Sequence, residues 1–209
     1  MSRTVEYFFS LASPWAYIGF KPFRAIVERH RLEVAYKPVG LGFVFDRTGG
    51  LPLGRRHPAR QRYRMVELQR WRQRRGLDFA LSPKNWPFDP TLADRTVIAL
   101  LHARRDPTPF LALAHPAIWE KEENLADEAV VARLLGEAGV EPAPILAAAR
   151  GDATEVIYLL NLENAVDKDV FGAPSYVVDG EVYWGQDRLE LLDDMLTSGR
   201  QAFQAEPAA

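Results

Sequence analysis

Ser13 and Pro14 stand at a junction where a side chain could take part in chemistry. They follow a hydrophobic, strand-like run that includes Phe8 and Phe9, and they precede a helix-like segment. A serine there is typical of a helix N-cap, worth about 1 kcal/mol, with proline favoured at the first helical position. The N-terminus of a helix also favours a bound anion, through its free N–H groups and its dipole. The chain has no cysteine, so a thiol that reacts at this junction has to arrive on a ligand.

Other residue types that carry chemistry are scattered. The four histidines do not have the spacing of metal ligands, so the sequence predicts no metal site. A Gly-x-Ser-x-Gly elbow, a phosphate-binding loop and a full dinucleotide fingerprint are missing from the sequence. Without cysteine the chain has no disulfide and no thiolate metal site.

A strongly basic region begins with GRRHPARQRYR, residues 54–64, and continues with Arg70, Arg72, Arg74 and Arg75. The apolar residues Met65, Leu68 and Trp71 lie among them at helical spacing, which indicates that most of these arginines form the solvated face of a helix. An anion-binding or nucleic-acid-binding patch is the alternative interpretation. The net charge of −2 gives the chain no overall attraction to nucleic acid or to anionic membranes.

The N-terminal elements that position Ser13 are readable from the residue pattern. The segment Arg3 to Leu11, rich in Val, Tyr and Phe, predicts a buried strand, and a helix follows from Pro14 to about His30. A second strand is indicated by the alternation of Leu32, Val34 and Tyr36 with charged residues. Strand, helix and strand in succession form a parallel crossover unit.

The middle of the chain, from about Pro58 to Asp167, has helical apolar spacing, whereas residues 44–54 look like a loop. Two amphipathic faces within the helical region are Val130, Val131, Leu134 and Leu135, and Val156, Leu159, Leu160 and Val166. Strands return in the segment from Pro174 to Trp184, where Asp179-Gly180 predicts a hairpin turn. A closing helix is expected to start near Gln186 or Asp187.

This order, βαβ, a helical block and ββα, predicts an α/β, thioredoxin-like fold. We expect a thioredoxin-like domain made of residues 1–57 and 168–209, with 58–167 as a large all-helical insertion. The 209 residues are 47% hydrophobic, enough for a sizeable core. The start of the chain does not look like a secretory signal, and no run approaches the roughly 18 apolar residues of a membrane span. We therefore expect a soluble, intracellular protein.

Three segments together resemble a known family, and the resemblance extends over nearly the whole chain. They are YFFSLASPWAYIG (7–19), YRMVELQRW (63–71) and VFGAPSYVVDGEVYWGQDRLELL (170–192). They are similar to the 2-hydroxychromene-2-carboxylate isomerases and the related kappa-class glutathione transferases, both of which have the DsbA-like fold. The last segment is the most specific, because a Gly-x-Pro turn, a hairpin and a Gly-x-Asp-Arg helix start follow in order.

The resemblance implies that Ser13 is catalytic and that glutathione is the cofactor. Redox-active relatives carry Cys-x-x-Cys at the four positions that read Ser13-Pro14-Trp15-Ala16 here, so Ser13 takes the place of the attacking thiol. It would keep its proton free to donate to a glutathione thiolate. A cis peptide bond before Pro174 would leave the backbone of Ala173 to pair with glutathione. The implied glutathione contacts are Ser13, Pro14, Trp15, Arg60, Ala173, Pro174, Gln186, Asp187 and Arg188.

The same resemblance points to a site for a second, aromatic substrate. Arg60 aligns with a family lysine that contacts glutathione or a substrate carboxylate, and Arg55 is a weaker candidate for the same task. Asn85 and Trp86 lie in a proline-bounded loop and could line an aromatic pocket. Two departures concern this substrate: glycine (Gly50 or Gly54) replaces a family asparagine, and the fork of an arginine is not equivalent to an ammonium.

The implied function is a glutathione-dependent isomerase of 2-hydroxychromene-2-carboxylate or a similar aromatic carboxylate. The thiolate adds reversibly, the ring opens, a former double bond rotates and glutathione leaves unchanged, yielding trans-o-hydroxybenzylidenepyruvate. The alternatives are a kappa-like glutathione S-transferase and a non-catalytic thioredoxin-like binding module. The resemblance also implies a cytoplasmic homodimer, with neither nucleic acid nor a membrane as a partner.

Overall fold

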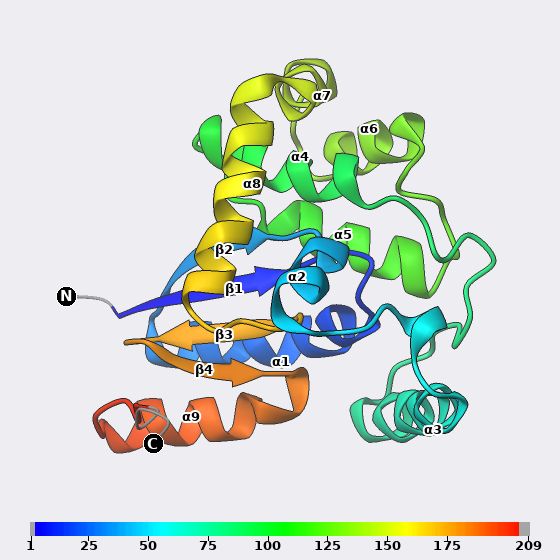
Figure 1. Ribbon diagram of the computed structural model, residues 1–209. Coiled ribbons are helices and arrows are strands. Elements are labelled where there is room, and N and C mark those ends of the chain that lie inside the picture. The colour runs from blue at the N-terminus through cyan, green and yellow to red at the C-terminus, as the bar shows by residue number, and fades with distance from the viewer. Residues whose placement is uncertain (1–2, 205–209) are drawn as a thin grey trace.

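A mixed β-sheet lies at the centre of the computed structural model, which describes residues 3–204 (Figure 1). Its strands β1 (Thr4–Phe9), β2 (Glu33–Pro38), β3 (Ser175–Val178) and β4 (Glu181–Trp184) have the order β2-β1-β3-β4. Strand β1 is parallel to β2, across the crossover helix α1 (Pro14–His30), and antiparallel to β3. The hairpin β3–β4 turns at Asp179 and Gly180, whose φ angles of 51° and 87° are those of the predicted Asp-Gly turn.

The remaining helices lie mostly over the faces of this sheet or beyond its β2 edge, and one lies apart from the sheet (Figure 1). They are α2 (Leu41–Thr48), α3 (Pro58–Arg75), α4 (Thr91–His102), α5 (Thr108–Trp119), α6 (Glu128–Glu137), α7 (Pro142–Arg150), α8 (Asp152–Asp167) and α9 (Leu189–Ser198), with 3-10 turns at η1 (Leu53–Arg55) and η2 (Gln186–Arg188). Alternate residues of β1 point to opposite faces. Tyr7 and Phe9 belong to the main core cluster, where Tyr7 contacts Phe23 of α1, whereas Phe8 belongs to a second cluster with Val44 of α2 and Leu162 of α8.

The predicted α/β, thioredoxin-like fold with added helices is confirmed. Strands, crossover helix, hairpin and closing helix follow in the expected order, and α3 to α8 occupy the chain between η1 and β3. The division into 1–57 with 168–209 and 58–167 stays a prediction. Leu162 and Ala165, at the end of α8, fall in the predicted insertion but pack against the sheet of the predicted thioredoxin-like domain.

Two details of the sequence interpretation are wrong. The segment 44–54, expected to be a loop, begins inside α2, because Val44 is buried against the sheet and gives this short helix an anchor. In α8 the face formed by Val156, Leu159 and Leu160 is exposed. This helix instead buries the side chains of Tyr158, Asn161, Leu162 and Ala165. Apolar residues lie on both sides of α8, so their spacing could not identify the side that packs.

His115 of α5 is a fully buried imidazole, 1% exposed, between the rings of Tyr17 and Phe20 of α1. Neither ring nitrogen has a hydrogen-bond partner among residues 3–204. Burial lowers its pKa from 6.5 to about 3, because the charged form loses its hydration.

We expect this histidine to make the fold sensitive to acid. Between about pH 6.5 and 3 the unfolded chain binds a proton that the folded protein excludes, so the free energy of unfolding falls as the pH falls. His115→Leu should remove about 2 kcal/mol of the loss between pH 7 and 5, measured by urea denaturation. His102→Gln, at an exposed position, is the control. Equal acid sensitivity in wild type and His115→Leu would refute this assignment.

Within residues 3–204, none of the helices combines the length and the apolar character that crossing a membrane requires.

Candidate active site

Ser13 is the N-cap of α1 and lies 3% exposed where β1 passes into the helix. Its hydroxyl oxygen accepts a hydrogen bond from the N–H of Ala16 at 3.4 Å, which confirms the predicted capping role. The hydroxyl itself donates to the carbonyl oxygen of Ala173, 160 residues further along the chain, at 3.1 Å. We expected this proton to be free, but in the structure Ala173 accepts it. A hydroxyl rotates readily, so a charged acceptor can displace the neutral carbonyl, since hydrogen bonds to charged groups are the stronger ones.

Two backbone N–H groups beside Ser13 have no partner among the described residues. One belongs to Trp15, since Pro14 has no N–H and the N–H groups of Ala16 and Tyr17 both bond to Ser13. The other belongs to Ala173. The first turn of α1 carries no acidic side chain. This arrangement suits an anion, because it combines free donors with the positive end of a 17-residue helix.

The turn opposite Ser13 has the backbone that the resemblance implies. The Ala173–Pro174 peptide bond is cis. The carbonyl of Pro174 accepts the N–H of Gly185 at 2.8 Å, which brings η2 to the same end of the sheet. A Cβ at Gly19 of α1 would overlap Gln186 and Tyr176, so α1 and η2 are in close contact there.

The proposed ligand residues of η2 differ in their availability. Gln186 is 1% exposed, and its side-chain oxygen accepts a hydrogen bond from Arg75 of α3 at 3.3 Å, so its side chain ties η2 to α3. Asp187 and Arg188 are exposed and form an ion pair with each other at 2.6 Å. A ligand ammonium would therefore have to compete with Arg188 for the Asp187 carboxylate.

The buried carboxylate of Asp94 anchors the loop that leads to Ser13. Asp94 belongs to α4 and is 0% exposed. It accepts hydrogen bonds from the Ser10 hydroxyl at 2.8 Å, the Leu11 N–H at 2.9 Å and the Tyr158 hydroxyl at 3.3 Å. Burial raises its pKa from 3.8 to about 7, against the lowering effect of these donors. Asp94 could not be identified from its sequence context, because an acidic residue in a helix is usually solvated.

The two loop residues predicted to line a substrate pocket lie in different surroundings. Trp86 is half-buried, and its indole N–H donates to the carbonyl of Ala12 at 3.0 Å, directly beside Ser13. Asn85 is exposed, and its amide donates to the carbonyl of Glu122 at 2.7 Å. The structure therefore brings Trp86 next to the site, while the Asn85 side chain is held by the segment after α5.

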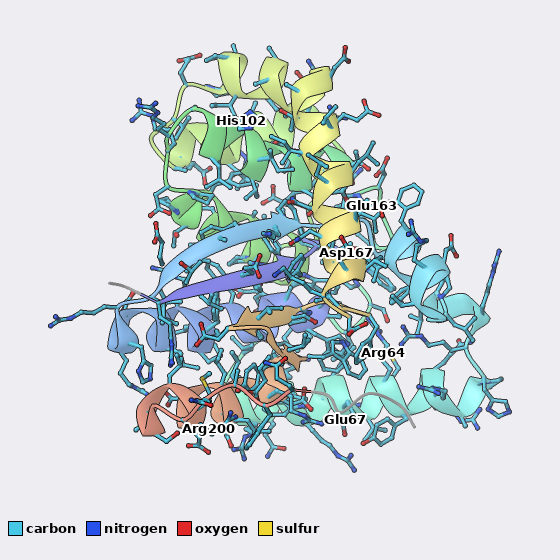
Figure 2. All side chains as sticks on the ribbon, turned by 60° about the vertical axis from the view of Figure 1, so that its left-hand side comes forward. Arg64, Glu67, His102, Glu163, Asp167 and Arg200 are labelled. Atoms are coloured by element: carbon cyan, nitrogen blue, oxygen red, sulfur yellow. The ribbon has the colours of Figure 1, made fainter. Side chains whose placement is uncertain are left out.

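Arg55 and Arg60, the predicted carboxylate contacts, are both exposed, the first in η1 and the second in α3. One turn after Arg60, Arg64 lies half-buried on the side of α3 that faces the sheet (Figure 2). Its guanidinium stands 5.1 Å from the centroid of the Trp86 ring. Burial, together with the nearby charge of Arg56, lowers its pKa to about 10. Arg64 was missed because it belongs to a run of arginines that resembles a solvated face.

An aromatic pair also flanks the cis-proline turn. The rings of Phe171 and Trp184 make an edge contact at 4.7 Å, and both side chains are about half exposed. A Cβ at Gly172 would overlap the Trp184 indole, so this pair lies directly against the segment that carries Ala173. Among residues 3–204, His, Asp and Glu side chains do not gather in threes as metal ligands would.

The relatives found among known proteins carry the name of the family that the sequence resembles. A 2-hydroxychromene-2-carboxylate isomerase from Sphingobium xenophagum is 23% identical over 198 residues, covering 94% of this chain and 99% of its own. An enzyme of the same name from Pseudomonas putida is 23% identical over 195 residues, covering 92% and 93%.

Solved structures agree with the observed fold. The structure of a 2-hydroxychromene-2-carboxylate isomerase matches with a TM-score of 0.78 and 22% identity, covering 93% of this chain and 95% of that one. The cytosolic disulfide reductase DsbM from Pseudomonas aeruginosa, solved with GSH, matches with a TM-score of 0.67 and 19% identity, covering 93% and 96%. The DSBA-like thioredoxin domain profile matches residues 4–197. This chain therefore belongs to the DSBA-like thioredoxin domain family.

Proposed function

We propose that this protein is a glutathione-dependent isomerase of 2-hydroxychromene-2-carboxylate or a similar aromatic carboxylate. The observation that carries the proposal is the set of donors around Ser13. The Ser13 hydroxyl and the unpartnered N–H of Trp15 lie at the N-terminus of α1, and the unpartnered N–H of Ala173 belongs to the turn that the hydroxyl contacts, in a chain without cysteine. The isomerase name of the relatives supports the reaction class. The neighbour solved with GSH supports glutathione as the thiol.

The described residues fit glutathione. The unpartnered N–H of Ala173, beside a cis-proline, can pair with the extended backbone of a peptide ligand. Asp187 can accept from the ligand's ammonium. Phe171 and Trp184 provide exposed aromatic surface beside the same segment.

When bound, glutathione would supply a thiolate nucleophile for the conjugated system of the substrate. The chain's own residues hold this sulfur as an anion: the Ser13 hydroxyl turns from Ala173 toward it, and the N–H of Trp15 and the dipole of α1 stabilise its charge. Trp86 holds the loop at Ala12 through the hydrogen bond of its indole N–H. In this mechanism Ser13 is not covalently modified. The homodimer and the cytoplasmic location that the resemblance implies stay predictions.

A glutathione-titrated assay tests the proposal. We expect 2-hydroxychromene-2-carboxylate to be converted to a product of equal mass, with a rate that saturates in glutathione and with no glutathione consumed. S-methylglutathione, which lacks the thiol, should compete with glutathione without supporting turnover. A glutathione adduct as the released product would identify a transferase. Turnover that does not depend on glutathione would contradict the proposal.

A further inference from the structure

The arginines of α3 divide into two groups that differ in their partners. In the second half, Arg70 pairs with Glu67, Arg72 with Asp78 and Arg74 with Glu190, while Arg75 forms no ion pair among the described residues but donates a hydrogen bond to Gln186. In the first half and in the preceding turn, no arginine forms an ion pair with any residue of the described range 3–204. These unpaired arginines are Arg55, Arg56, Arg60, Arg62 and Arg64. The chain has 28 acidic residues, yet none of those described forms an ion pair with these five arginines. The segment 55–64 therefore carries a local excess of positive charge.

Within this group Arg64 and Arg56 are half-buried, whereas Arg55, Arg60 and Arg62 are exposed. Arg64 is the one of the two that belongs to α3. It lies one turn before Leu68, which is 0% exposed, and is thus on the inward stripe of α3 that continues to Trp71. Among residues 3–204 the polar contact of its guanidinium is a long one, from Nη1 to the sulfur of Met65 at 3.8 Å. A guanidinium with five donors is thereby held partly out of water without an oxygen acceptor, which is costly unless an anion completes the site.

Trp86 connects this guanidinium to the loop that leads to Ser13. The indole ring lies against Arg64, with 5.1 Å from guanidinium carbon to ring centroid, and the N–H of the same indole bonds to Ala12 at 3.0 Å. Arg64 and Ser13 are therefore separated by little more than one indole side chain and one residue of backbone. A small ligand at the N-terminus of α1 can reach both.

We propose that Arg64 is a carboxylate-binding residue of the active site, with Trp86 orienting its guanidinium and Arg56 and Arg60 adding positive charge at the entrance. This inference rests on the proposed function and names a further binding residue for it. Arg56 is itself fixed, because its Nε donates to the carbonyl of Leu51 at 2.7 Å and its guanidinium lies 5.6 Å from the centroid of the Phe45 ring. A planar carboxylate can accept two parallel hydrogen bonds from the planar guanidinium of Arg64. The ammonium of a lysine at this position would not offer such a pair of donors.

Two ligands of the proposed reaction carry such a carboxylate: glutathione, at its glycine end, and the aromatic substrate. The residues that face Arg64 do not distinguish these sources, so the experiment has one arm for each. Arg64→Met keeps the apolar stem against Trp86 and removes the charge, and Arg64→Lys keeps the charge without the fork. Arg70→Met is the matched control, because Arg70 lies on the same helix, is exposed and pairs with Glu67.

The first arm measures glutathione by calorimetry. If Arg64 binds the glycine carboxylate, Arg64→Met weakens glutathione binding roughly 10- to 100-fold, as expected for one charge-assisted contact. Glutathione ethylated at the glycine carboxylate then binds wild type and Arg64→Met equally. Arg64→Lys lies between wild type and Arg64→Met, and Arg70→Met resembles wild type.

The second arm measures an unreactive aromatic acid, coumarin-3-carboxylate, and its neutral carboxamide, without glutathione. If Arg64 binds the substrate carboxylate, wild type prefers the acid to the amide roughly 10-fold or more, and Arg64→Met loses this preference. This arm requires neither turnover nor glutathione, so a preference here supports the inference even if the proposed isomerase activity fails. Equal binding of both carboxylates to wild type and Arg64→Met, within a factor of two, would overturn the inference while leaving the thiol site at Ser13 untouched.

Discussion

Ser13→Ala is expected to lower turnover roughly 10²-fold or more, about 2.7 kcal/mol, at a pH where the wild-type ligand thiol is ionised. The variant loses the donor that turns to the sulfur, so the pKa of the bound thiol should rise and the pH–rate profile should shift to higher pH. Initial rates at saturating glutathione across a pH series measure both effects. A profile with an unchanged midpoint would count against the role of the hydroxyl.

The capping role of Ser13 has to be separated from this donor role. Ser13→Ala also loses the cap contact to Ala16, which costs about 1 kcal/mol of stability, whereas Ser13→Gly costs only a few tenths. Both variants lose the hydroxyl donor. Equal losses of activity, with unequal losses of stability, would assign the effect to the hydroxyl. An activity that follows stability would assign it to the cap.

Asp94→Asn is expected to remove a pH-dependent contribution of about 4 kcal/mol to the free energy of unfolding. The carboxyl has a pKa of about 7 when folded and 3.8 as the unperturbed reference, so the folded protein holds a proton that the unfolded chain releases between these values. The free energy of unfolding of the wild type should therefore receive a contribution that falls as the pH rises from 4 to 7. Asparagine stays neutral and should remove that decline.

Urea denaturation at pH 5 and pH 8 measures the part of this effect that falls between these pH values, about 3 kcal/mol, with Asp46→Asn, at an exposed position, as the control. As the pH rises from 5 to 8, Asp94→Asn should become more stable relative to wild type, and at pH 8 it should be the more stable protein. His115 contributes the opposite slope at acid pH, so the comparison is best repeated in His115→Leu. Curves for wild type and Asp94→Asn that run parallel from pH 5 to 8 would show that Asp94 is ionised throughout.

The scaffold around Ser13 was predictable because its signals are local. A run of apolar residues, a Ser-Pro helix start and an Asp-Gly turn each determine structure within a few residues, and β1, α1 and the β3–β4 hairpin follow them. α2 was not predictable in the same way. Its eight residues are held by Val44, which packs against Phe8 of the sheet, and this long-range contact leaves no periodic signal in so short a segment.

The candidate site was predictable only where one segment identified it. Ser13, the Ala173–Pro174 turn and η2 carry motifs, and the fold brings them together at one end of the sheet. Arg64 and Asp94 carry no motif. Their significance comes from burial by distant segments, Trp86 for Arg64 and the loop at Ser10 and Leu11 for Asp94. A charged residue within a helix has the same appearance in a sequence whether its surroundings are water or protein.

The ionisation of the bound thiol tests the central claim most directly. Ultraviolet absorbance of the thiolate can be followed against pH for glutathione bound to wild type and to Ser13→Ala. The donors at the N-terminus of α1 predict a midpoint roughly two pH units below that of a free thiol, near 8.5, in wild type, and a return toward the free value in Ser13→Ala. A wild-type midpoint equal to that of free glutathione, or no binding at millimolar concentration, would contradict the account.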